Sequence, residues 1–121
     1  MLIIWVDDDI ELLTSDIRML ERENIPCVGF SHPQEAIEYF KKGGNTPTAM
    51  ITDYNMPGMN GVELAQKVRE ILPNLPILFC SGSYNKEMST VKNSLAISKC
   101  CTADKVIDDI NYLLEKYNVE H

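Results

Sequence analysis

The hydrophobic positions of the chain fall into five short runs, separated by longer stretches of mixed polarity. Each run has the length of a β-strand and lacks the polar alternation of a sheet with one wet face. Uninterrupted runs of this kind are typical of parallel strands that helices cover on both faces. The predicted strands are residues 2–6, 27–30, 49–51, 77–80 and 95–97.

Amphipathic helices are predicted in the stretches around these strands, because apolar residues recur there every three or four positions. Four stretches carry a clear apolar stripe. The stripes consist of Ile10, Leu13, Ile17 and Leu20; Ala36, Ile37 and Phe40; Val62, Leu64, Ala65, Val68 and Leu72; and Val106, Ile110, Leu113 and Tyr117.

Two of these helices carry start signals. Ser31 stands three residues before Gln34, and Asn60 stands three residues before Glu63, which is the spacing of a capping box. Pro33 also fits the first turn of its helix, where a missing N–H costs little. The sequence therefore predicts a capping box at both positions.

The fourth of the five expected helices is the weak one. Residues 84–93 offer only Met88 and Val91 as apolar anchors, so we expect this helix to be short, irregular or mobile. Strands that alternate with helices imply right-handed crossovers and one open parallel sheet. The sequence therefore predicts a doubly wound α/β fold, with residues 1–121 as one domain.

Charge and hydropathy narrow the classes of partner. The formal net charge of −7 argues against nucleic-acid binding, which needs clustered Lys and Arg, but it suits a cation site. No apolar run approaches the ~20 residues that cross a bilayer, and the apolar start lacks the basic leader of a signal peptide. We expect a cytoplasmic protein that binds neither membrane nor nucleic acid directly.

The cysteines indicate packing more than metal binding. They contain no C-x-x-C pair, and His32 and His121 are far apart in sequence, so a zinc site is not expected. Free thiols that are buried or half-buried are expected instead. The four residues are Cys27, Cys80, Cys100 and Cys101.

Candidate chemistry lies where the predicted strands end, because ligands of open parallel sheets bind outside the carboxyl ends of the strands. Clustered carboxylates repel one another unless a cation is present, and their oxygen atoms suit Mg²⁺. A lysine and a hydroxyl beside them could hold phosphoryl oxygens, and a carboxylate nucleophile would form an acyl phosphate. The residues that follow the strands are Asp7, Asp8 and Asp9, then Asp53, Ser81 and Lys99, with Asp9 expected as a helix cap.

Two motifs carry a family resemblance. Residues 3–9 read Ile-Ile-Trp-Val-Asp-Asp-Asp, and residues 51–64 read Ile-Thr-Asp-Tyr-Asn-Met-Pro-Gly-Met-Asn-Gly-Val-Glu-Leu. In this order the chain resembles the receiver domains of two-component response regulators, of which chemotaxis regulators are an example. The resemblance implies a flavodoxin-like sheet of five parallel strands in the order 2-1-3-4-5, with helices on both faces.

The same resemblance implies a role for each candidate residue. Such a domain is a signalling phosphoacceptor that catalyses only its own phosphorylation and dephosphorylation. A histidine kinase or a histidine phosphotransfer protein would supply the phosphoryl group, and an effector domain or protein would read it. By this resemblance Asp53 is the phosphoacceptor, Asp7, Asp8, Asp53 and the Asn55 carbonyl bind Mg²⁺, Ser81 and Lys99 contact the phosphoryl oxygens, and Ser83 and Asn55 tune the access of water.

The chain departs from the family pattern on one side. Cys100 replaces the proline that usually follows Lys99, so a trans peptide is expected there, because a cis bond before a non-proline residue is costly. Ala96 replaces the usual switch aromatic, and the interval from Ser81 to Lys99 is short. We therefore hypothesise that phosphorylation is read through ordering of residues 84–93.

Two other classes remain open. A haloacid-dehalogenase-like phosphotransferase is suggested by Asp7-x-Asp9, although Glu11 stands where that motif has Thr or Val. Its second acidic pair would be Asp108 and Asp109, which lie within a predicted helix. A pseudo-receiver, a binding module with the fold but without phosphorylation, is the other alternative. The changes at positions 96 and 100 keep it open, whereas the retained candidate residues argue against it, namely Asp7, Asp8, Asp53, Ser81 and Lys99.

Overall fold

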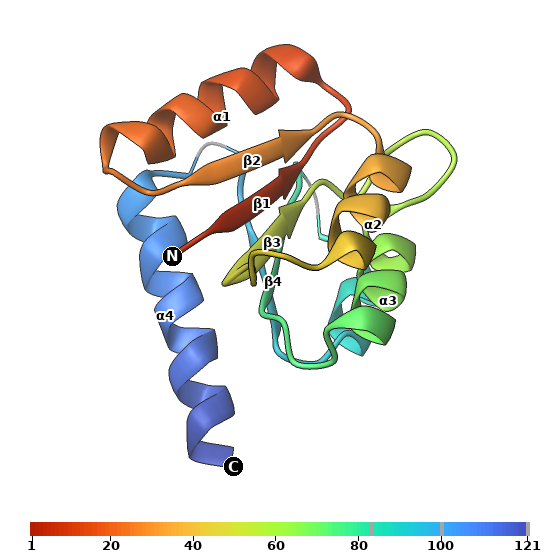
Figure 1. Ribbon diagram of the computed structural model, residues 1–121, viewed down its shortest axis with the longest axis vertical. Coiled ribbons are helices and arrows are strands. Elements are labelled where there is room, and N and C mark those ends of the chain that lie inside the picture. The colour runs from red at the N-terminus through yellow and green to blue at the C-terminus, as the bar shows by residue number, and fades with distance from the viewer. Residues whose placement is uncertain (83, 100, 121) are drawn as a thin grey trace.

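Strands and helices alternate along the chain in the computed structural model, which describes residues 1–82, 84–99 and 101–120, the last four of them by their backbone (Figure 1). The predicted alternation is confirmed. The elements are β1 (Ile3–Val6), α1 (Ile10–Arg22), β2 (Cys27–Phe30), α2 (Pro33–Lys42), β3 (Ala49–Thr52), α3 (Gly61–Ile71), β4 (Ile77–Cys80), the 3₁₀ helix η1 (Lys86–Thr90), β5 (Ser94–Ile97) and α4 (Ala103–Glu120).

The five strands form one sheet in the order β2-β1-β3-β4-β5, and every neighbouring pair is parallel. This is the topology that the family resemblance implies. In register, Val6 of β1 lies beside Thr52 of β3. Because all strands run in one direction, the residues that follow them gather at a single edge of the sheet.

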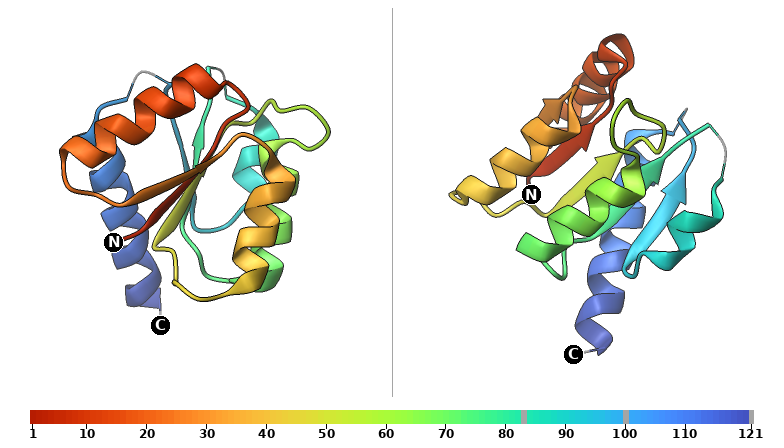
Figure 2. Two further views of the ribbon diagram at one scale, coloured as in Figure 1. Left: turned by 45° about the horizontal axis from the view of Figure 1, so that its top comes forward. Right: turned by 90° about the vertical axis from the view of Figure 1, so that its right-hand side faces the viewer.

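Helices cover both faces of the sheet (Figure 2). Side chains from α2, α3 and η1 pack on one face against Ile4, Val6 and Phe79. Side chains from α1 and α4 pack on the other face against Ile3 and Trp5. Successive residues of β1 thus point to opposite faces, and both faces are apolar, which is why the strand shows no polar alternation.

One of the two predicted capping boxes is confirmed. The Asn60 side chain accepts from the Glu63 N–H at 2.9 Å, and the Glu63 carboxylate accepts from the Asn60 N–H at 3.0 Å. The box at Ser31 is wrong, because α2 begins after His32, whose side chain makes no cap. The Gln34 amide donates instead to Glu38 one turn on, at 3.1 Å.

The predicted short fourth helix is confirmed as η1, a single five-residue 3₁₀ segment. Met88 anchors it, with only 3% of its surface exposed. The Arg69 guanidinium of α3 holds the turn between η1 and β5. It donates to the Lys92 carbonyl at 2.6 Å and to the Asn93 carbonyl at 3.1 Å.

The expectations for the cysteines and for the peptide before Cys100 can be compared with the structure only in part. Cys27, Cys80 and Cys101 are free thiols, as predicted. The predicted trans peptide before Cys100 lies outside the described residues, and so does the side chain of Tyr117. None of the described helices combines the length and apolar character needed to cross a bilayer.

Candidate functional site

Three carboxylates meet at the carboxyl edge of the sheet. Asp7 and Asp8 follow β1, and Asp53 follows β3. One oxygen of each lies within 4.8 Å of the others. Asp7 and Asp53 are buried, with 3% and 5% of their surface exposed, whereas Asp8 is open to solvent. The convergence predicted from the ends of the strands is therefore confirmed for these three residues.

Asp53 has a partner on each carboxylate oxygen. Lys99, from the loop after β5, places its ammonium 3.0 Å from Oδ2. The Tyr54 N–H donates to Oδ1 at 2.8 Å. Partial burial opposes the charge on Lys99, but the hydrogen bond and the charge of Asp53 outweigh it and raise the lysine pKa. The lysine is therefore a fixed positive charge beside the Asp53 carboxylate.

The surroundings of Asp7 disfavour the ionised form of its carboxyl group. Burial raises its pKa, and the nearby charges of Asp53 and Asp8 act in the same direction. The Asp9 N–H, 3.0 Å from Asp7 Oδ1, and the charge of Lys99 oppose that rise. With three carboxylates facing one ammonium, the site has a surplus of negative charge that a cation would offset.

Asp9 has a different role from its neighbours. Its side chain accepts from the Leu12 N–H at 3.1 Å and so caps α1. The expected cap is confirmed, and the carboxylates that group with Asp7 are those of Asp8 and Asp53. Asp109 of α4, from the other acidic pair, is ion-paired with Lys105 at 2.9 Å.

The backbone at Asp53 is held by close packing. The Thr52 hydroxyl donates to the Asp53 carbonyl at 3.0 Å, and the Gly61 N–H donates to the Tyr54 carbonyl at 2.8 Å. A Cβ on Gly61 would collide with the Asp53 carbonyl oxygen. Glycine at the start of α3 therefore allows the helix to approach the strand end that carries the carboxylate.

Two further predicted residues, Ser81 and Asn55, follow strands at the same edge of the sheet. Ser81 directly follows β4, and its N–H donates to the Ile97 carbonyl at 3.2 Å. Asn55 is exposed on the loop after β3, and a metal-binding role for its carbonyl remains a prediction. Ser83 lies outside the described residues.

Asp16 is a residue that the sequence reading missed. It lies half-buried on α1, where burial and the charge of Asp7 raise its pKa to about 6 and Lys99 opposes the rise. A signal was present, because Asp16 stands three residues after Leu13 and four before Leu20, within the apolar stripe of the helix.

Comparison with known proteins identifies the class. The family model for the response regulator receiver domain matches residues 3–111, and the chain belongs to this family. It is 25% identical over 116 residues to the response regulator receiver protein CpdR of Brucella abortus, covering 93% of this chain and 95% of CpdR. It superposes on a response regulator receiver protein from Sinorhizobium medicae with a TM-score of 0.82 and 28% identity, covering 94% of each chain.

A further relative is much longer than this chain. The match to ARR21, an Arabidopsis thaliana protein named as a two-component response regulator, has 37% identity over 82 residues. It covers 68% of this chain but only 13% of the plant protein. The fold, the acidic site and these matches together assign the chain to two-component signalling, as a receiver domain.

Proposed function

We propose that this receiver domain is a phosphoacceptor, which takes a phosphoryl group from a phosphohistidine onto Asp53 in a Mg²⁺-dependent reaction and changes its surface in response. The observation that carries the proposal is the setting of Asp53. Its buried carboxylate lies 3.0 Å from the Lys99 ammonium and within 4.8 Å of oxygen atoms of Asp7 and Asp8. A carboxylate nucleophile, a fixed cation and an acidic pocket are the parts that transfer to aspartate requires.

The donor set fits magnesium. Mg²⁺ prefers oxygen ligands and often binds through one or two carboxylates together with a phosphate. Asp7, Asp8 and Asp53, with the Asn55 carbonyl, would hold it, and the bound ion would supply charge that offsets the repulsion between Asp53 and an incoming phosphate. Three carboxylates opposed by one lysine leave room for a divalent cation in the charge balance of the site.

Each residue then has a separable task. A carboxylate oxygen of Asp53 attacks phosphorus, and the P–N bond to the donor imidazole breaks as the new P–O bond forms. Lys99 stabilises the charge on the transferred phosphoryl oxygens from its position beside Asp53. The Ser81 hydroxyl, at the end of β4, is the proposed hydrogen-bond donor to the same oxygens. The domain thus catalyses only its own phosphorylation and dephosphorylation.

The proposed partners follow from this chemistry. A histidine kinase or a histidine phosphotransfer protein supplies the phosphoryl group in the cytoplasm, and an effector domain or protein reads the result. Residues 1–121 form the proposed receiver domain. Direct binding to nucleic acid is not proposed for a chain with a net charge of −7.

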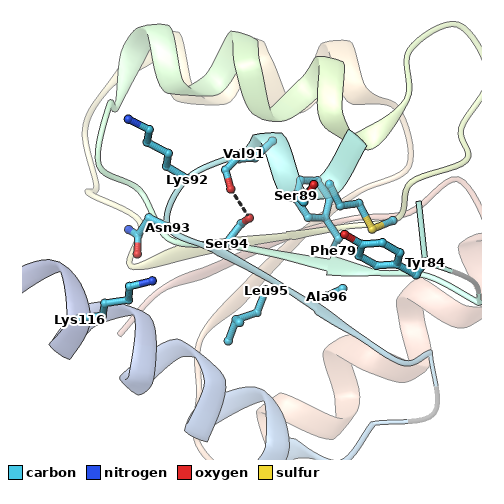
Figure 3. A pocket seen from close by; sticks show the side chains of 11 residues that line it. Phe79, Tyr84, Ser89, Val91, Lys92, Asn93, Ser94, Leu95, Ala96 and Lys116 are labelled. Carbon is cyan, nitrogen blue, oxygen red and sulfur yellow. Dashed lines mark hydrogen bonds between the residues drawn. The ribbon is translucent and has the colours of Figure 1, made fainter. Parts of the chain in front are cut away.

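The region around Ala96 supports a way of signalling phosphorylation that differs from the switch aromatic of the family. Ala96 is exposed and lines a hollow of about 400 Å³ together with Phe79, Tyr84 and Met88 (Figure 3). An alanine has no ring to swing inward. The proposed route is instead the segment of residues 84–93, which lies directly over this hollow and is tied to the site through Tyr54.

The test is the intact mass of the protein after incubation with acetyl phosphate and Mg²⁺. The wild type should gain the mass of one phosphoryl group, and omission of Mg²⁺ or the Asp53→Ala substitution should abolish the gain. Far-ultraviolet circular dichroism of the variant checks that it is folded. The absence of a gain in the wild type, with acetyl phosphate and with a phosphorylated kinase, would identify a pseudo-receiver instead.

A further inference from the structure

Cys80 and Cys101 form a thiol pair on the face of the sheet that α1 and α4 cover. Cys80 ends β4 and is buried, with 3% of its surface exposed, whereas Cys101 lies partly exposed on the loop before α4. Both pack in the same cluster. The Cys80 sulfur lies against the Ser98 carbonyl at the start of the loop that carries Cys101, and the two thiols interact although they are distant in sequence.

The two thiols differ in access and acidity. The Cys80 S–H has one proton and two acceptors within reach, the Cys101 sulfur and the Ser98 carbonyl at 3.6 Å. Donation from Cys80 lowers the pKa of Cys101, although burial partly opposes this. The same hydrogen bond, together with burial, raises the pKa of Cys80. A partly exposed thiol of lowered pKa beside a second thiol is the arrangement of a redox-sensing cysteine with its resolving partner.

We propose that Cys80 and Cys101 are a peroxide-responsive dithiol that closes reversibly to a disulfide. The Cys101 thiolate attacks one oxygen of hydrogen peroxide, and the O–O bond breaks to leave a sulfenic acid and hydroxide. The Cys80 sulfur then attacks the Cys101 sulfur, the S–O bond breaks, and the oxygen leaves as water with the Cys80 proton. Overall the two thiols lose two electrons and two protons, and the peroxide becomes two molecules of water.

The position of the pair gives such a bond a structural consequence. Cys80 directly precedes Ser81, and Cys101 comes two residues after Lys99. A disulfide would therefore join the strand end that carries Ser81 to the loop that carries the lysine paired with Asp53. The oxidation itself requires no phosphorylation, so its test is independent of the proposed function.

The experiment is peroxide titration of the folded full chain, followed by alkylation, intact mass and peptide mapping. The wild type should lose the mass of two hydrogen atoms and yield a cross-linked peptide pair containing Cys80 and Cys101. A thiol reductant should restore the original mass. Circular dichroism before and after oxidation should show the same fold.

Single variants separate the role of Cys101, which attacks peroxide, from that of Cys80, which resolves the sulfenic acid. Cys80→Ala should leave Cys101 as a sulfenic acid, with the mass gain of one oxygen and labelling by dimedone. Cys101→Ser should leave Cys80 unoxidised, because that thiol is buried. Cys27→Ser and Cys100→Ser are the matched controls, and both should retain the cross-link. Cys27 in particular should not react, because burial raises the pKa of its thiol to about 12.

Three results would overturn the proposal: a disulfide that contains Cys100, a sulfinic acid on Cys101 without any cross-link, or an unchanged mass under peroxide. The wild-type peptide map decides among these outcomes even if a variant fails to fold.

Discussion

Tyr54 and Glu87 are joined by a hydrogen bond, with 3.1 Å between the phenolic oxygen and the carboxylate oxygen that accepts from it. Tyr54 also donates its backbone N–H to Oδ1 of Asp53 at 2.8 Å. One residue therefore bridges the proposed phosphoacceptor and η1. Phosphorylation would alter the carboxylate that holds the Tyr54 backbone, and the ring would carry that change to η1.

Tyr54→Phe should loosen η1 without unfolding the domain. The lost hydrogen bond is exposed, so the free energy of unfolding should change little, whereas amide exchange at residues 86–90 should become faster. Hydrogen exchange by mass spectrometry measures both local and global opening. Tyr112→Phe on α4, where the residue is 53% exposed, is the control and should leave exchange at residues 86–90 unchanged. Equal exchange in wild type and Tyr54→Phe would show that the bridge does not hold η1.

A phosphoryl mimic should order residues 84–98. In the wild type, beryllofluoride with Mg²⁺ should slow amide exchange in this range, since the proposed output is an ordering of the segment over Ala96. Asp53→Ala should show no such response, and Tyr54→Phe should show a smaller one. Unchanged exchange at residues 84–98 in a wild-type sample that has bound the mimic would contradict the proposed output route.

The strands could be predicted from sequence because a parallel strand covered on both faces must be apolar throughout, whatever its neighbours are. The meeting of Asp7, Asp8 and Asp53 followed from the same topology, since all strands end at one edge. Asn60 and Glu63 could be predicted as a cap because both partners lie within four residues of each other. These features depend on local sequence or on the fold class alone.

Other features depend on side-chain contacts that local sequence does not specify. The hydrogen bond from Tyr54 to Glu87 spans 33 positions and requires the observed position of η1. The capping box at Ser31 failed because α2 begins one residue later than expected, after His32, so Gln34 is not in the third helical position and bonds to Glu38 instead. Asp16 was missed because a lone carboxylate in an apolar stripe is read as a break in the pattern.

Arg69→Met should destabilise the domain by about 2 kcal/mol, because the guanidinium hydrogen bonds to backbone carbonyls would be lost. Arg69 donates to Leu75 at 2.8 Å and to Lys92 and Asn93 in the turn before β5. Urea denaturation measures the loss. Arg69→Lys should not restore stability, because a single ammonium lacks the forked geometry of the guanidinium.

The matched control for Arg69 is Lys67→Met on the exposed side of the same helix. It removes one positive charge and should change the free energy of unfolding by less than about 0.5 kcal/mol. Equal losses of unfolding free energy in Arg69→Met and Lys67→Met would show that the effect comes from the lost charge and not from the hydrogen bonds of Arg69 to the turn before β5.

Gly61→Ala should cost about 1–3 kcal/mol, because the new methyl group would collide with backbone that cannot easily move. The nearest atoms are the carbonyl oxygen of Asp53 and the Cα of Tyr54. Thermal unfolding measures the loss. Gly82→Ala is the control, since no atom lies within 4 Å of the added methyl group, and it should leave stability nearly unchanged. A fully stable Gly61→Ala protein would show that α3 can withdraw from the strand end.

Asp16 should make the domain less stable as pH rises. Its pKa is raised from 3.8 to about 6 by burial and by the charge of Asp7, so the folded state holds a proton that the unfolded chain has already released. The stabilisation is therefore fully present below pH 3.8 and is lost as pH rises through about 6. Asp16→Asn removes this titration, and its stability relative to wild type should increase by about 1 kcal/mol between pH 4 and pH 7, since water partly screens a half-exposed carboxyl.

Urea denaturation at several pH values, without Mg²⁺, measures this difference for Asp16→Asn. The exposed Asp108→Asn on α4 is the control, and its stability relative to wild type should not vary over the same range. Mg²⁺ should reduce the pH effect in the wild type, because a cation beside Asp7 would offset the charge that helps to raise the Asp16 pKa. A wild type and Asp16→Asn whose stabilities run parallel from pH 4 to pH 7 would mean that Asp16 titrates as an ordinary exposed carboxyl.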